Sequence, residues 1–194
     1  MTTANKISIG RLLLIPVFVG FALYYARSVA MGSPREVWRW AAVATFLVAA
    51  LSDAVDGYIA RRWSQQTRLG LILDPLADKG LMLAAIVTLS VSSWPDGFPL
   101  WFVLIVVSRD FIIIGGALAL HYWIGKVRLH PHMVGKAATF FQIVSIAWVM
   151  LRVPWPSLWA TVPAGILTFF SGVIYIADGI GQVHASSHGR VEAE

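Results

Sequence analysis

The acidic residues that could do chemistry gather in one stretch of the chain, at Asp53, Asp56, Asp74 and Asp78. They stand in or beside apolar segments of a chain that is 58% hydrophobic. Desolvation and mutual repulsion oppose the charged form of carboxylates in such surroundings. A hard divalent cation, Mg²⁺ or Mn²⁺, removes both difficulties, because it takes oxygen ligands and completes its shell with water and phosphate oxygens. These residue types therefore predict a metal site that binds phosphate groups.

The spacing of these residues places them on two helix faces. Positions three, four or seven residues apart lie on the same face of a helix. The first such stripe consists of Asp53, Asp56, Gly57 and Ala60. The second stripe consists of Gly70, Asp74 and Asp78. If the two stripes face each other, they form a pocket of four carboxylates, with Arg61 at its edge offering a planar fork to phosphate. This arrangement is typical of a site for phosphoryl or phosphatidyl transfer.

The full pattern, Asp-x2-Asp-Gly-x2-Ala-Arg-x8-Gly-x3-Asp-x3-Asp from Asp53 to Asp78, resembles the signature of the CDP-alcohol phosphotransferase family. The resemblance implies a helical membrane fold and transfer of a phosphatidyl group from CDP-diacylglycerol to an alcohol, with release of CMP. It also implies two bound Mg²⁺ or Mn²⁺ ions, held by Asp53, Asp56, Asp74 and Asp78. The residues alone leave open which aspartate is the catalytic base.

The same resemblance assigns roles within the signature. Asp78 would face the metal ions and also take the proton from the hydroxyl group of the acceptor. The CDP group would be lined by Gly57, Ala60, Arg61 and Gly70. A side chain as small as that of glycine or alanine leaves room for a bulky ligand near the backbone.

The acceptor alcohol has two candidates. The residues from Ala60 to Lys79 resemble the branch of the family that makes phosphatidylglycerophosphate, which favours glycerol 3-phosphate. Asp110 after Arg109, Ala117 further along and the 127–136 segment are more similar to the cardiolipin synthase branch, whose acceptor is phosphatidylglycerol. We expect glycerol 3-phosphate, with phosphatidylglycerol as the alternative. The cations expected to bind the acceptor phosphate are Arg109, Lys126, Arg128 and Lys136.

Arg109 and Asp110 are adjacent in an apolar segment. Neighbouring residues on a helix do not face each other, so we expect them to have different partners. A structural ion pair with another helix and contact with the substrate are equally good interpretations of Arg109.

The elements that position these residues are predicted by hydropathy. A mean hydropathy of +0.72 in 194 residues is incompatible with one small soluble core. We therefore expect an all-α integral membrane protein with six transmembrane helices and a cytoplasm-facing active site. The expected spans are residues 12–25, 38–60, 71–92, 100–122, 134–151 and 158–180.

Charge predicts the orientation and the partners. Basic residues concentrate in the 61–68 and 126–136 loops, which the positive-inside rule places in the cytoplasm. The net charge of +5 suits membrane lipids with anionic headgroups, and no nucleic acid is expected as a partner. We expect the bacterial inner membrane as the location. A homodimer is kept as an open alternative.

One membrane domain is expected over residues 1–184, followed by a polar tail, residues 185–194, that we expect to be disordered. The rival function is an ion or proton transporter, because intramembrane carboxylates are also typical of that class. The four aspartates are expected close to one membrane face beside Arg61, however, whereas transport sites lie near the midplane. This difference favours the enzyme.

Overall fold

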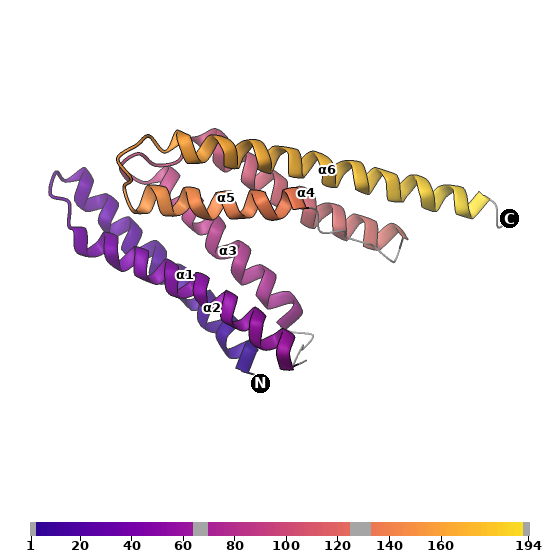
Figure 1. Cartoon of the computed structure of the whole chain (residues 1–194), viewed down its shortest axis with the longest axis horizontal. Helices are drawn as coiled ribbons and strands as arrows, with labels where there is room; N and C mark the ends of the chain where they lie inside the picture. The colour runs from indigo at the N-terminus through magenta and orange to yellow at the C-terminus, as the bar shows by residue number, and fades with distance from the viewer. Residues whose placement is uncertain (1–2, 64–69, 125–132, 192–194) are drawn as a thin grey trace. The chain divides into compact units, whose positions relative to one another are not determined.

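A computed structural model describes the backbone of residues 3–63, 70–124 and 133–191, and the side chains of residues 9–52, 79–116 and 133–181. The described backbone is all-helical, as expected, and each expected span corresponds to one helix (Figure 1). The helices are α1 (Thr3–Ala30), α2 (Glu36–Trp63), α3 (Gly70–Val91), α4 (Leu100–Ile124), α5 (Met133–Met150) and α6 (Leu158–Val191).

Three helices among the described residues are long and apolar enough to cross a membrane: Ile9–Ala30 in α1, Met133–Met150 in α5 and Leu158–Gly181 in α6. Large apolar side chains on α1, α4 and α6 point outward; Leu13, Phe111 and Phe169, for example, are exposed. Exposed large apolar side chains in this number are suited to contact with lipid. The structure is therefore that of a membrane protein.

The C-terminal end differs from the expectation. α6 continues as a helix to Val191, so residues 185–191 of the segment expected to be disordered are helical. No proline follows Pro163 in the chain, so nothing in the backbone chemistry prevents the helical hydrogen bonds from continuing beyond the apolar span. The expectation of disorder was wrong because it considered only the polarity of the segment. A preceding helix can continue into a polar segment.

The chain forms two compact units, and the first comprises Met1–Phe98 and Ile146–Ser157. Within it α1 packs against α2 and α3, and α2 contacts α3. Small residues line these contacts: Ala22, Ala42 and Ala85 are fully buried. The backbones can therefore approach closely, as is common between helices in membranes. This packing matters for function, because α2 and α3 carry the four aspartates of the signature.

Polar contacts join the loops at one end of the first unit. Arg152 Nη1 donates to Tyr25 Oη at 3.2 Å and to Glu36 Oε1 at 3.3 Å. The backbone N–H of Ser157 donates to Asp96 Oδ2 at 2.5 Å. Asp96 and Arg152 each have φ of 52°, a left-handed conformation that is uncommon outside glycine. The contacts therefore hold the loops between α1 and α2, α3 and α4, and α5 and α6 in one arrangement.

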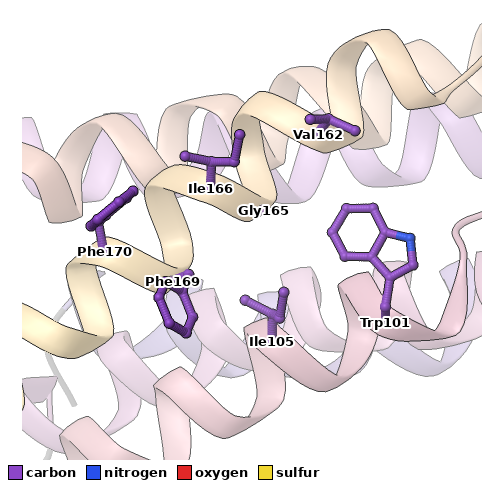
Figure 2. A pocket seen from close by; sticks show the side chains of 7 residues that line it. All are labelled: Trp101, Ile105, Val162, Gly165, Ile166, Phe169 and Phe170. Carbon is purple, nitrogen blue, oxygen red and sulfur yellow. The ribbon is translucent and has the colours of Figure 1, made fainter.

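The second unit comprises Pro99–Ser145 and Leu158–Glu194, and in it α4 packs along α6. Gly165 of α6 allows this contact, because a Cβ there would lie 2.6 Å from Cζ3 of Trp101. Beside it the two helices form a groove of about 360 Å³ whose lining is apolar (Figure 2). The lining residues are Trp101, Ile105, Val162, Gly165, Ile166, Phe169 and Phe170.

Buried hydrogen bonds connect α5 to α6 in this unit. Gln142 Nε2 donates to Thr168 Oγ1 at 2.8 Å, and Ser145 Oγ donates to the carbonyl oxygen of Ala160 at 2.9 Å. All three side chains are almost fully buried. These bonds specify which faces of α5 and α6 meet, since apolar contacts alone discriminate poorly between helix faces in lipid.

Gly97, in the turn before α4, lies close to the backbone of α3. A Cβ on Gly97 would collide with the backbone carbonyl oxygen of Leu89. Gly97→Ala should therefore destabilise the protein by roughly 1–3 kcal/mol, the usual cost of overpacking. Thermal unfolding of the detergent-solubilised protein measures this. Gly116→Ala is the matched control, because no heavy atom lies within 4 Å of a Cβ there. Equal unfolding midpoints for the two variants would contradict the prediction.

Candidate functional site

The signature aspartates lie on two helices of the first unit. Asp53 and Asp56 belong to α2, and Asp74 and Asp78 belong to the first turns of α3. Their backbone is helical, so the Cα atoms of each pair lie roughly 40–60° apart around the helix axis, on one face. Since α2 contacts α3, the two stripes are carried by neighbouring helices.

Several predicted site residues fall outside what the structure describes. For the signature the structure gives the helical backbone and no side chains; this holds for Asp53, Asp56, Gly57, Ala60, Arg61, Gly70, Asp74 and Asp78. Lys126 and Arg128 lie outside the described residues altogether. Arg109 and Lys136 are described in full.

The donor types of the signature fit a divalent metal. Four carboxylates on two adjacent helices supply only oxygen ligands, the set that Mg²⁺ and Mn²⁺ prefer. Among the described side chains, no group of three or more His, Cys, Asp or Glu residues could hold a metal ion. The signature is therefore the candidate metal site.

A second polar cluster lies in the other unit, around Arg109 of α4. This side chain is only 6% exposed. Its Nη1 donates to Asp110 Oδ1 at 2.7 Å, and its Nη2 donates to Ser171 Oγ of α6 at 3.3 Å. The guanidinium carbon also lies 5.9 Å from the ring centre of Tyr175, at the limit of a cation–π contact. α4 and α6 thus share a buried cation.

The pairing of Arg109 with Asp110 corrects the expectation that these neighbours have different partners. The Cα–Cβ bonds of adjacent helical residues do point in different directions. The arginine side chain is long enough, however, to bring its guanidinium back to the carboxylate of the next residue. Arg109 in addition reaches another helix through Ser171, so the interhelical contact is made by a hydroxyl group and the ion pair lies within α4.

The start of α5 meets the same cluster. A Cβ on Gly135 would lie 3.4 Å from both Arg109 Nη2 and Ser171 Oγ. Lys136 follows directly and its side chain is exposed. The fold thus brings the segment that carries Lys136 close to Arg109. These two residues are two of the four cations predicted to bind the acceptor.

Sequence reasoning missed the α6 side of this cluster. Ser171 is 1% exposed, and Gly172 places its Cα within reach of the Arg109 side chain, because a Cβ there would lie 3.6 Å from Cγ. Ser171 and Tyr175 are four residues apart and share a helix face. Two polar side chains on one face of an apolar span are a usable signal that this face is buried against another helix.

The contribution of the Arg109–Asp110 ion pair to stability can be tested by mutation. Removing only the anion leaves a buried cation without its strongest partner, whereas removing both charges does not. Asp110→Ala should therefore lower the unfolding midpoint more than the double variant Arg109→Met/Asp110→Ala. Thermal unfolding in detergent of the wild type, the two single variants and the double variant tests this prediction. A double variant less stable than Asp110→Ala would show that the pair is not the main role of Asp110.

Comparison with known proteins agrees with the signature. The CDP-alcohol phosphatidyltransferase family model matches residues 1–174, which include parts of both units. A CDP-diacylglycerol--glycerol-3-phosphate 3-phosphatidyltransferase of Bacillus subtilis (strain 168) is 35% identical over 151 residues, 76% of this chain and 76% of that protein. The protein of the same name from Escherichia coli (strain K12) is 34% identical over 172 residues, 84% of this chain and 82% of that protein. The chain is therefore a member of the CDP-alcohol phosphatidyltransferase family.

Proposed function

We propose that this protein transfers a phosphatidyl group from CDP-diacylglycerol to glycerol 3-phosphate. A hydroxyl oxygen of the acceptor bonds to the phosphorus that carries the diacylglycerol, the bond from that phosphorus to CMP breaks, and the hydroxyl proton is removed. The names of the relatives support this reaction. The observation that carries it is the placement of the signature on the contacting helices α2 and α3.

The metal site we propose consists of Asp53, Asp56, Asp74 and Asp78, and it holds two ions of Mg²⁺ or Mn²⁺. When bound, the ions neutralise the charge of the diphosphate and the charge that develops on departing CMP. The aspartates would hold these ions beside the proposed CDP site. Asp78 additionally takes the hydroxyl proton of the acceptor, a role that requires a carboxylate within hydrogen-bond reach of that hydroxyl.

The nucleotide site we propose lies along the same helices. Gly57, Ala60 and Gly70 present little side-chain volume, so that the CDP group can lie against the backbone. Arg61 donates two parallel hydrogen bonds to phosphate oxygens, since its guanidinium matches their geometry. These four residues bind and orient CDP but take no part in proton transfer.

The acceptor phosphate is bound, in our proposal, by Arg109, Lys126, Arg128 and Lys136. Arg109 supplies a cation whose direction is set by its contacts, and Lys136 supplies an exposed ammonium group on the neighbouring segment of α5. A dianionic phosphate needs more than one cation, and Asp110 already offsets part of the charge of Arg109. Lys136 is therefore expected to carry much of the attraction for the acceptor.

The protein as a whole is proposed to have six membrane spans, with both termini and the active site in the cytoplasm of a bacterium and the chain in its inner membrane. Residues 1–184 form one catalytic domain in this proposal, which the family match across both units supports. The basic loops at 61–68 and 126–136 support the orientation. A homodimer stays a prediction.

Replacing one metal ligand should separate activity from folding. Asp56→Asn should reduce turnover at least a hundred-fold while leaving the unfolding midpoint unchanged or higher, because removing one of several repelling carboxylates relieves strain. Asp96→Asn is the control, since its side-chain oxygen can still accept from Ser157. Wild type stripped with EDTA should lose turnover like the Asp56 variant and regain it with Mg²⁺ or Mn²⁺. Full turnover after stripping would contradict the metal site.

The acceptor is tested by competition between substrates. Purified protein with CDP-diacylglycerol should release CMP with glycerol 3-phosphate and form phosphatidylglycerophosphate. Lys136→Gln should raise the KM for glycerol 3-phosphate roughly ten-fold, because one charge-assisted contact contributes about 1.5 kcal/mol or more. The KM for CDP-diacylglycerol should change less. If the wild type instead converts phosphatidylglycerol to cardiolipin and ignores glycerol 3-phosphate, the proposed acceptor is wrong.

A further inference from the structure

The cluster around Arg109 contains two residues that neither the signature nor the proposed reaction uses. Ser171 is buried on α6 and accepts a hydrogen bond from Arg109 Nη2 at 3.3 Å. Gly135 is buried on α5, and a Cβ there would touch both Nη2 and Ser171 Oγ at 3.4 Å. One residue therefore holds the guanidinium by a bond, and the other brings the backbone of α5 against the same two atoms.

These two contacts act on the same nitrogen from different helices. Nη1 is held by Asp110 of the same helix, so the position of Nη2 fixes the remaining orientation of the planar guanidinium. Arginine loses much rotamer freedom when its fork must adopt one direction to bind an anion. A side chain that is already directed loses less of this freedom on binding, which strengthens the binding of the ligand.

A purely structural interpretation of Ser171 would be a tether between α4 and α6. The second unit already contains such tethers: Gln142 bonds to Thr168, and Ser145 bonds to the backbone of α6. Those bonds involve no charged group. Ser171 differs because its partner is a cation next to the segment that carries Lys136, where we have proposed that the acceptor phosphate binds.

We propose that Ser171 and Gly135 are positioning residues that set the direction of the Arg109 guanidinium toward the phosphate of the acceptor. This inference rests on the proposed function, since it assumes that Arg109 contacts that phosphate. Ser171 and Gly135 themselves touch neither the substrate nor the metal. They determine the affinity for the acceptor, while the transfer step and the nucleotide site do not depend on them.

The test measures KM and kcat for glycerol 3-phosphate in Ser171→Ala and Arg109→Gln, alone and combined. Ser171→Ala should raise the acceptor KM roughly three- to ten-fold, the factor that corresponds to the net contribution of one ordinary hydrogen bond. Its kcat and its KM for CDP-diacylglycerol should stay near wild type. In the Arg109→Gln background, Ser171→Ala should add no further increase, because its effect passes through Arg109.

Ser145→Ala is the matched control, since it removes an equally buried hydroxyl hydrogen bond between α5 and α6 without touching Arg109. It should leave the acceptor KM unchanged in both backgrounds. Gly135→Ala provides a second variant should Ser171→Ala fail to fold, and it should raise the same KM without changing the KM for CDP-diacylglycerol. Inorganic phosphate competes with the acceptor. In Ser171→Ala and in Gly135→Ala its affinity should fall by the same factor by which the acceptor KM rises in that variant.

The outcomes separate the two proposals. If wild type does not use glycerol 3-phosphate, or if Arg109→Gln leaves its KM unchanged, the proposed role of Arg109 fails and the inference fails with it. If Arg109→Gln raises the KM but Ser171→Ala and Gly135→Ala do not, the proposed function stands and the positioning inference alone is overturned. Equal effects of Ser171→Ala with and without Arg109 would also overturn it, because they indicate a tether that acts independently.

Discussion

A buried polar group in a helix that crosses a bilayer has no water to bind, so it must find its partner inside the protein. This constraint applies to the second unit, where α5 and α6 are long and apolar enough to cross a membrane. Arg109 reaches Asp110 and Ser171, Gln142 reaches Thr168, and the Ser145 hydroxyl reaches the backbone of α6. Each partner lies at a definite height and on a definite face. The polar contacts therefore fix the register of α4, α5 and α6, which apolar packing would leave undetermined.

The same constraint acts differently in the first unit. There the long-range polar contacts described above lie at the loop end of the helices: Arg152 joins Tyr25 and Glu36, and Asp96 receives the N–H of Ser157. The helix interfaces consist of small and apolar residues such as Ala22, Ala42 and Ala85. Besides the four aspartates on α2 and α3, the described helices of this unit bury one charged side chain, Arg11 of α1, which is 1% exposed. Four aspartates on two contacting helices are expected where binding or catalysis has overridden stability.

Much of the fold followed from the sequence because apolar stretches of about twenty residues have few alternatives to a membrane helix. The helical stripes of Asp53 with Asp56 and of Asp74 with Asp78 also followed, since spacing alone defines a helix face. The contact of Arg109 with Ser171 could not be predicted, because it joins residues 62 positions apart and depends on how two helices pack. The helical continuation to Val191 was missed because polarity does not report where a helix stops.

The length of α6 has a consequence for how the protein meets its surroundings. Its apolar part, Leu158–Gly181, is about 36 Å long at 1.5 Å per residue, slightly more than the hydrocarbon layer of about 30 Å. From residue 182 to Val191 the helix rises about another 15 Å. A fluorescent protein or affinity tag joined after Val191 would thus be separated from the lipid headgroups by this helical extension. Such a fusion would leave the membrane surface accessible to lipid substrates.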